Sequence, residues 1–337
     1  MKNNHKNFPK VSIIIPCYNE EKTIGLLLKA IQKQDYPLTN IEIVIADSLS
    51  TDATKEKISE FIKSNPSVLI KVIDNAKQTI PSGINCAAKV SKGEILIRLD
   101  AHSEPNGEYV KTSVDLLKNN IAENVGGVWE IQPGEDTCIA KAIAKAAAHP
   151  LGVGDAKYRV STKSQYVNTV PFGAFYKKTF ENIGCFDETL LANEDYEFNT
   201  RLKNSGGKVW LDTRIRSKYY ARKNLKELAK QYWRYGFWKV RMLKRYPATI
   251  RWRQAIPPLF MASVIFLGVL SIFISFTRII LGVEFAIYFL PLILAGLQTA
   301  IKHNDPCFLL IPFAIITMHF SWGGGFLSSL FTSVWKD

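Results

Sequence analysis

Apolar runs and amphipathic stretches alternate along the first third of the chain. The apolar runs are short and rich in β-branched residues, which predicts buried strands at 11–16, 41–47, 68–74 and 95–100. Stretches with helical spacing lie between them, at 20–33, 52–64 and 79–91. This repeated alternation predicts an α/β fold in which right-handed crossovers connect a mostly parallel sheet.

The middle of the chain is less regular. A further strand is predicted at 125–131, an alanine-rich helix at 136–148, and a helix from Asn193 to Asn204. From 225 to 246, apolar residues recur at helical spacing and form a wide apolar face with basic flanks. Such a helix is suited to lying along a membrane surface.

The residues from Ile256 onward are almost free of charge. Three apolar segments, at 259–276, 285–301 and 307–335, are long enough for membrane-spanning helices. Gly323-Gly324-Gly325 could divide the third segment into a span and a short re-entrant or interfacial piece. We expect three spans, with two spans and an interfacial hairpin as the alternative. The expected division of the chain is a soluble domain at 1–222, a basic interfacial helix region at 223–255 and a membrane domain at 256–337.

The formal net charge of +13 is concentrated in one region. Residues 201–253 hold 17 Lys and Arg against 2 acidic residues, whereas the rest of the chain holds 26 basic and 28 acidic residues. A basic block directly before apolar segments follows the positive-inside rule. Aromatic residues interleave with these charges, as in single-strand nucleic-acid binding. The adjacent apolar segments favour the membrane instead, so we expect no nucleic-acid partner.

Five cysteines are scattered along the sequence without metal-type spacing: Cys17, Cys86, Cys138, Cys185 and Cys307. Their odd number and irregular spacing predict a reducing compartment and no disulfides. The first residues, Met1 to Asn7, lack the apolar stretch of a signal peptide. We therefore expect a multi-pass protein of the cytoplasmic membrane whose soluble domain faces the cytoplasm.

The strand predicted at 95–100 ends in Asp100, and His102 follows closely. Ligands of open parallel sheets bind outside the carboxyl ends of the strands. A carboxylate and an imidazole there could hold a divalent metal that binds phosphate oxygens, although an aspartate capping a turn beside a surface histidine would give the same pattern. A dinucleotide-binding dehydrogenase is excluded, because the turn Pro16-Cys-Tyr-Asn-Glu-Glu21 contains no glycine.

Three motifs follow one another along the chain: Ser12-Ile-Ile-Ile-Pro-Cys-Tyr-Asn-Glu20, Ala46-Asp-Ser-Leu-Ser-Thr-Asp-Ala-Thr54 and Leu99-Asp-Ala-His102. In order and spacing they resemble the family 2 inverting glycosyltransferases, whose GT-A fold is a Rossmann-like, mostly parallel sheet that binds a nucleotide sugar. The resemblance extends from about Val11 to Tyr235. It is closest to the exopolysaccharide subgroup of succinoglycan-type glucosyltransferases, in which Asp-Ala-His replaces the commoner Asp-x-Asp.

The resemblance implies a nucleotide-sugar site at the ends of the first two strands. Pro16, Tyr18 and Glu20 match positions that line the base and the ribose, although an acidic Glu20 also suits a plain helix N-terminus. Asp47 matches the aspartate that hydrogen-bonds the base edge. The sequence departs from the family there, because Ser48 follows where a second aspartate is usual.

The resemblance also assigns the metal and the chemistry. Asp100 would bind the nucleotide sugar and, with His102, would hold Mg²⁺ or Mn²⁺ on the donor diphosphate, where the cation neutralises charge on the leaving group. Asp195 matches the general base that takes the proton of the acceptor hydroxyl, and Glu194 would orient it or bind the acceptor. A helix start capped by Asn193 with acids in its first turn is the alternative explanation.

The acceptor side is expected to include two further segments. Gly173-Ala174 would let the backbone approach a sugar, or would simply be a kink in a strand. Gln231, Arg234 and Tyr235 resemble the family's Gln-x-x-Arg-Trp motif with Tyr in place of Trp. Their spacing puts them on one helix face, where they could contact the diphosphate and the acceptor.

These expectations combine in one function. The chain is predicted to be a metal-dependent, membrane-anchored inverting glycosyltransferase of cell-surface polysaccharide synthesis. It would move one hexose from a nucleotide sugar, most simply UDP-glucose, to a lipid-linked oligosaccharide. Transfer of a single sugar is expected because the chain has too few spans to form a polysaccharide channel. The expected partners are the donor, the lipid-linked glycan acceptor, membrane lipids and other polysaccharide-assembly enzymes. Two alternatives stay open: a polyprenyl-phosphate sugar synthase, and a catalytically silent GT-A membrane scaffold.

Overall fold

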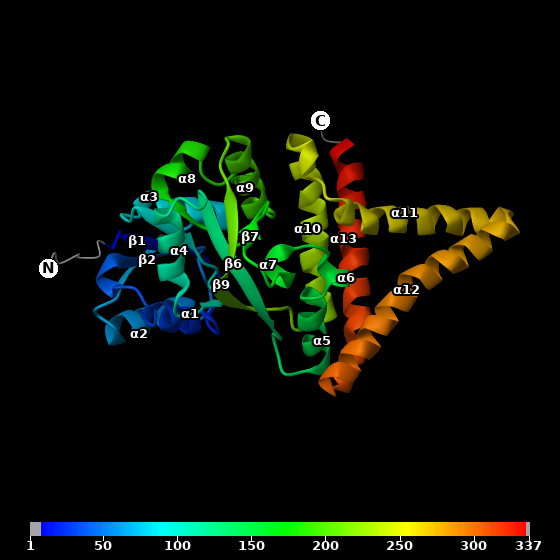
Figure 1. Cartoon of the computed structure of the whole chain (residues 1–337), viewed down its shortest axis with the longest axis horizontal. Helices are drawn as coiled ribbons and strands as arrows, with labels where there is room; N and C mark the ends of the chain where they lie inside the picture. The colour runs from blue at the N-terminus through cyan, green and yellow to red at the C-terminus, as the bar shows by residue number, and fades with distance from the viewer. Residues whose placement is uncertain (1–7, 335–337) are drawn as a thin grey trace. The chain divides into compact units, whose positions relative to one another are not determined.

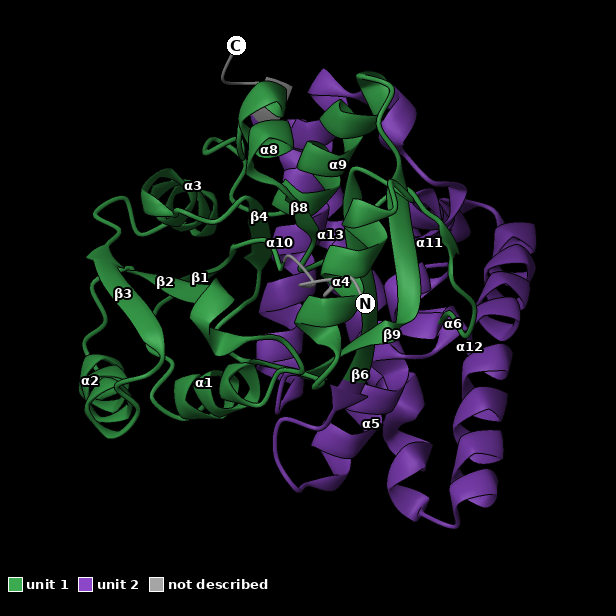
Figure 2. Ribbon diagram, turned by 60° about the vertical axis from the view of Figure 1, so that its left-hand side comes forward, with its two compact units in different colours: residues 1–130, 161–219 green, residues 131–160, 220–337 purple. Residues whose placement is uncertain are grey.

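The computed structural model describes residues 8–334 (Figure 1). The chain forms two compact units that are discontinuous in sequence (Figure 2). The first unit takes the chain up to Glu130 together with Ser161–Tyr219, and the second takes Ile131–Val160 together with the chain from Tyr220 onward. The predicted division at 222 and 255 stays a prediction, and the compact units differ from it in grouping 131–160 with the C-terminal helices.

Within residues 8–334 the sheet has nine strands, in the order β3-β2-β1-β4-β8-β6-β9-β5, with β7 beside β9. Their bounds are β1 Val11–Cys17, β2 Ile41–Asp47, β3 Leu69–Asp74, β4 Ile95–Arg98, β5 Ser103–Pro105, β6 Asn124–Gln132, β7 Gln165–Tyr166, β8 Ala174–Tyr176 and β9 Val209–Tyr220. The strands from β3 to β4 are parallel, whereas β8 is antiparallel to both β4 and β6. The predicted α/β fold is confirmed.

The helices of the first unit pack on both faces of the parallel strands. They are α1 Ile24–Gln32, α2 Thr54–Ser64, α3 Ile80–Val90, α4 Tyr109–Lys118, α8 Lys177–Ile183 and α9 Glu194–Asn204, with a short 3₁₀ turn η1 at Leu38–Asn40. Ile13 and Ile15 join one buried cluster with α1 and α4, and Ile14 joins another with α3 and α8. Because β1 is covered on both faces, its sequence is a continuous apolar run rather than an alternating one.

The second unit consists of helices. They are α5 Cys138–Ala147, α6 Pro150–Val153, α7 Lys157–Val160, α10 Leu225–Arg245, α11 Trp252–Phe273, α12 Ser275–His303 and α13 Ile311–Val334, with 3₁₀ turns η2 Pro247–Thr249 and η3 Pro306–Leu310. Three of them, α11, α12 and η3–α13, are long and apolar enough to cross a membrane, as predicted. Trp335, the last residue of the third predicted segment, lies outside the described residues.

The glycines at 323–325 do not divide α13, which continues through them. They lie where α13 contacts α10, and Figure 1 shows these two helices side by side. A Cβ atom on Gly325 would lie 2.2 Å from the carbonyl oxygen of Trp233, and one on Gly236 would lie 2.1 Å from that of Trp322. The two backbones therefore touch directly, as they do at small-residue helix crossings.

We expect Gly236→Ala to lower the thermal unfolding temperature of the detergent-solubilised protein. The added methyl group would meet a backbone carbonyl that cannot rotate away, and such overpacking typically costs about 1–3 kcal/mol. Gly268→Ala on α11 is the matched control, since nothing lies within 4 Å of its Cβ position. That control should be neutral or slightly stabilising, because alanine favours a helix over glycine. Equal melting temperatures for the two variants would contradict the crossing.

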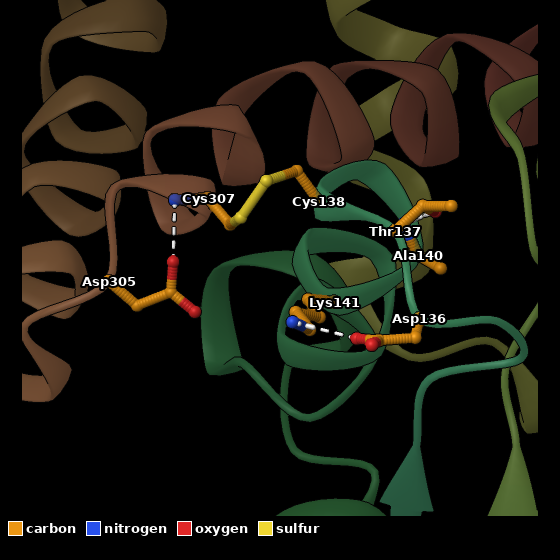
Figure 3. The surroundings of a disulfide bond; sticks show 7 residues. All are labelled: Asp136, Thr137, Cys138, Ala140, Lys141, Asp305 and Cys307. Carbon is orange, nitrogen blue, oxygen red and sulfur yellow. Dashed lines mark hydrogen bonds and ion pairs between the residues drawn. A yellow bond between two sulfur atoms is a disulfide. The ribbon is translucent and has the colours of Figure 1, made fainter.

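One sequence prediction is wrong: Cys138 and Cys307 form a disulfide (Figure 3). Cys138 begins α5 and Cys307 lies in η3, where its backbone N–H donates to Asp305 Oδ1 at 2.9 Å. The pairing spans 169 residues and arises from the packing of α5 against η3, which cysteine spacing cannot show. The remaining cysteines, Cys17, Cys86 and Cys185, are free thiols. The expected absence of disulfides therefore no longer supports a reducing compartment.

Candidate active site

The loops that follow β1 and β2 are joined by hydrogen bonds. Asn19 adopts a left-handed backbone conformation with φ 53°, its N–H donates to Ser50 Oγ at 2.9 Å, and its side-chain oxygen accepts from the N–H of Thr51 at 2.8 Å. Tyr18 is 54% exposed in this turn, while Pro16 is buried. Tyr18 is therefore accessible to solvent just after β1, which is compatible with the predicted contact with the base and ribose.

Asp47 ends β2 and is fully buried. Its Oδ2 accepts from the backbone N–H of Ser50 at 3.0 Å and lies 3.2 Å from Lys55 Nζ, and its Oδ1 accepts from Ser50 Oγ. These contacts fix the loop after β2. A carboxylate has further acceptor capacity, so contact with a base edge stays a prediction.

Glu20, predicted to bind the ribose, contacts His102, predicted to bind the metal. His102 Nδ1 lies 2.9 Å from Glu20 Oε1. A second carboxylate oxygen of Glu20 accepts from Thr23 Oγ1, which holds the carboxylate at the start of α1. Metal-ligating histidines commonly bind a carboxylate through their other ring nitrogen, which fixes the ring and raises its basicity. Glu20 therefore orients the imidazole of His102.

The residues at the end of β4 fit a divalent cation. The side chains of Asp100 and His102 are 20% and 28% exposed, and in the described part of the chain Asp100 uses only Oδ1 for its ion pair with Arg98. No group of three or more His, Cys, Asp or Glu side chains within residues 8–334 is placed to hold a metal. A cation on this pair would take its remaining ligands from phosphate oxygens and water, as Mg²⁺ commonly does in nucleotide sites.

Arg98 lies beneath these residues on β4 with a side chain only 2% exposed. Its Nη2 lies 3.0 Å from both Asp100 Oδ1 and Glu194 Oε1, and its Nη1 contacts Asp195 Oδ1. Burial alone would lower the pKa of Arg98, but the nearby carboxylates of Asp195, Asp100 and Glu194 hold that pKa well above its usual range. The predicted base and the predicted metal ligand therefore bind the same guanidinium.

Asp195 and Glu194 occupy the first turn of α9. Asn193 has φ 65° and its side chain makes no capping hydrogen bond, so the predicted side-chain cap is absent, although the acidic residues do lie in the first turn of the helix. Burial raises the pKa of Asp195 to about 7; Arg98 opposes the rise, and the carboxylates of Glu194 and Asp100 add to it. The side chain keeps 23% exposure. A reachable carboxyl that titrates near neutral pH suits a general base.

We expect the rate of sugar transfer to fall as the pH drops below about 7. Asp195 accepts a proton only when it is ionised, so each pH unit below its pKa should remove about tenfold of the rate. The measurement is the pH profile of kcat/KM, with donor binding followed over the same range to separate loss of affinity. A profile that stays flat down to the ordinary pKa of aspartate, about 4, would contradict this assignment.

The remaining predicted residues have structural partners. A Cβ on Gly173 would lie 2.3 Å from Asn124 Oδ1, so close packing accounts for this glycine without a sugar. Gln231 Nε2 donates to the hydroxyl of Tyr235 at 3.0 Å, which puts both on one face of α10. Gln231, Arg234 and Tyr235 belong to the second unit, and their contact with diphosphate or acceptor stays a prediction.

Sequence reasoning did not assign Arg98. Its signal was a single charge within the apolar run Ile95–Leu99, where every neighbour is buried. A buried charge is costly unless it is paired. The partners on α9 lie almost a hundred residues further along the chain, and the fold is needed to bring them to β4.

The parallel half of the sheet has a carboxylate and an imidazole at its carboxyl end, beside a partly exposed carboxyl group with a pKa of about 7. This arrangement fits a glycosyltransferase of the GT-A type. The fold agrees with the solved structure described as a mannosyltransferase from Pyrobaculum calidifontis in complex with GDP-Man and Mn²⁺. That match has a TM-score of 0.66 and 17% identity, and covers 96% of this chain and 88% of that one. Residues 12–184 match Glycosyl transferase family 2, and the chain belongs to this family.

Two curated relatives extend over nearly the whole chain. One is the dolichyl N-acetyl-alpha-D-glucosaminyl phosphate 3-beta-D-2,3-diacetamido-2,3-dideoxy-beta-D-glucuronosyltransferase of Methanococcus voltae, 30% identical over 95% of this chain and 97% of the relative. The other is the succinoglycan biosynthesis protein ExoA of Rhizobium meliloti, 30% identical over 94% of each. The predicted resemblance to family 2 and to succinoglycan-type enzymes is confirmed.

Proposed function

We propose that this protein is a membrane-anchored inverting glycosyltransferase that moves one hexose from a nucleotide sugar, with UDP-glucose as the first candidate, to a lipid-linked oligosaccharide. The observation that carries the proposal is the pairing of Asp195 and Asp100 through Arg98. It holds a proton acceptor with a pKa near 7 beside the residues that fit a donor-bound cation. The full-length relatives support a sugar-transfer role.

In this proposal Asp195 accepts the proton of the acceptor hydroxyl while that oxygen attacks the anomeric carbon. The bond from that carbon to the diphosphate oxygen breaks on the opposite face, so the configuration inverts and a nucleoside diphosphate leaves. Asp100 and His102 would hold a divalent cation, which when bound supplies positive charge to the leaving diphosphate. Glu20 fixes the imidazole of His102, and Glu194 shares the guanidinium with the base.

The lipid acceptor is supported by the second unit. On α11 and α12 many large apolar side chains are exposed, including Ile272 at 70%, Phe273 at 79% and Ile287 at 70%. Such surface is typical of contact with lipid. Arg251 and Arg253 at the start of α11 favour the cytoplasmic side for that end. The name of the Methanococcus voltae relative gives a dolichyl phosphate-linked sugar as its acceptor.

The test is release of UDP or GDP from a panel of nucleotide sugars by the purified, detergent-solubilised protein with extracted lipid-linked glycans. We expect one donor to be turned over and the sugar to appear on the glycan by mass spectrometry. A sugar joined to polyprenyl phosphate through a phosphodiester would assign the alternative synthase. Glycan binding without turnover of any donor would overturn the proposal in favour of a silent scaffold.

A further inference from the structure

We propose that Arg98 is a positioning residue, which holds the base Asp195 in register with the donor-binding residue Asp100. The proposal rests on the proposed function, because it concerns the same transfer. It assigns a task to a residue whose side chain is only 2% exposed. Its evidence is the set of partners that this one guanidinium takes.

The partners come from two separate elements. Asp100 follows Arg98 at the end of β4, whereas Glu194 and Asp195 begin α9. Nη2 bridges Asp100 and Glu194 at 3.0 Å each, and Nη1 contacts Asp195. The guanidinium is thus the polar link between the strand end and the helix start, and it sets how far apart the two carboxylates lie.

The charges make this link necessary. Three carboxylates converge on one buried cation, and in its absence they would repel one another. A planar guanidinium can bind carboxylates along two of its edges, whereas a lysine ammonium is a point charge on a flexible stem. The face of Phe186 lies 5.8 Å from Arg98 Cζ and further restricts the side chain. The position therefore requires the planar geometry of a guanidinium as well as a positive charge.

A second arginine shows what a purely structural role looks like. Arg201, on α9, binds Glu197 through Nε and Nη2 and also donates to the backbone carbonyls of Ile183 and Cys185. It therefore braces the chain after α8. Within residues 8–334 the guanidinium of Arg98 contacts carboxylates and no backbone carbonyl, and its Nε–H has no acceptor. Arg98 therefore contacts side chains of the site and does not hold the backbone in place, as Arg201 does.

The consequence is a separation of binding from turnover. Asp100 lies two residues after the end of β4, which pairs with β1 and β8, so we expect it to keep its place without Arg98 and donor affinity to change little. Asp195 would lose its fixed orientation, and a base displaced by about 1 Å can cost about 10²-fold in rate. A structural role would instead reduce the fraction of folded protein and leave the turnover of each folded molecule unchanged.

The experiment compares Arg98→Lys with Arg201→Lys as the matched control. Donor titration counts the competent sites and gives the dissociation constant, and turnover is expressed per competent site. For Arg98→Lys we expect kcat to fall about 10–100-fold with the donor dissociation constant within about threefold of wild type. Arg201→Lys should lower the melting temperature and keep kcat per site within about threefold, since it lies outside the site.

If Arg98→Lys does not fold, Glu194→Gln is measured in its place. It removes one charge from the cluster at nearly constant shape and leaves the guanidinium in place. We expect kcat to fall by less than in Arg98→Lys, again with unchanged donor affinity. If kcat per site stays within threefold of wild type in every folded variant, Arg98 has no positioning role. A wild-type protein that transfers no sugar would overturn the proposed function itself, which is a separate outcome.

Discussion

The variant Asp195→Asn should lose sugar transfer by about 10²–10⁴-fold, the range for removal of a general base. The asparagine keeps the size of the side chain and can still accept a hydrogen bond from Arg98. It cannot accept the proton of the acceptor hydroxyl at neutral pH. Donor affinity should stay near that of wild type, because the nucleotide and its cation are assigned to the ends of β1, β2 and β4. Both quantities can be measured on one purified preparation.

The control for this variant is Asp136→Asn. Asp136 is 90% exposed and forms a surface ion pair with Lys141 at 2.8 Å, in the second unit (Figure 3). Such a pair contributes little to stability, so this second Asp→Asn change should leave transfer unaltered. Turnover of Asp195→Asn within threefold of wild type would mean that the base is another residue. Altered melting with normal turnover would mean that Asp195 is structural.

Removal of divalent metal should abolish transfer, and Mn²⁺ or Mg²⁺ should restore it. The leaving group carries charge that Asp100 and His102 cannot neutralise without a cation. His102→Ala should raise the metal concentration required for half-maximal rate, whereas His102→Asp should keep part of the activity because a carboxylate is also a ligand. The readout is the rate against free metal concentration, together with metal-dependent donor binding in EDTA-treated protein.

Glu20→Gln separates metal binding from ribose binding. If Glu20 orients the imidazole, as its contact with His102 Nδ1 indicates, this variant should raise the metal requirement in the same direction as His102→Ala. If it only binds ribose, donor affinity should fall with no change in metal dependence. Full activity of His102→Ala in EDTA would remove the metal assignment altogether.

The parallel half of the sheet and the antiparallel strand β6 could be predicted from the sequence, whereas the other antiparallel strands could not. The strands β1, β2 and β4 are buried on both faces, and their apolar runs are unambiguous. β8 has only three residues, and β9 alternates apolar and basic positions. The basic residues of β9 belong to the region 201–253, which the sequence pattern predicts to be a basic block next to the membrane. In fact Arg214, Arg216 and Lys218 form ion pairs with Asp212, Glu130 and Glu104 in the first unit.

The candidate site shows the same limit. Asp100, His102 and Asp195 could be assigned because family motifs mark them, and the residues of each motif are close in sequence. Arg98 and the contact between Glu20 and His102 depend on segments that only the fold brings together. The pattern of one segment does not show whether a buried charge forms ion pairs with residues that are distant in the sequence. The charge of Arg98 within an apolar strand was nevertheless a usable sign, because such a charge requires partners.

The bond between Cys138 and Cys307 closes a covalent ring that contains every residue between them, Asp195 and the whole of α9 included. A protease that cuts the backbone once within this ring opens it without releasing a fragment. The two pieces part only when the disulfide is reduced and the folded contacts are lost. A ring of this length also restricts the unfolded chain, which can then explore fewer conformations. The N-terminal strands β1 to β4, whose ends are assigned to the donor, lie outside the ring and unfold as an open chain, whereas the segment that carries the predicted base Asp195 lies within it.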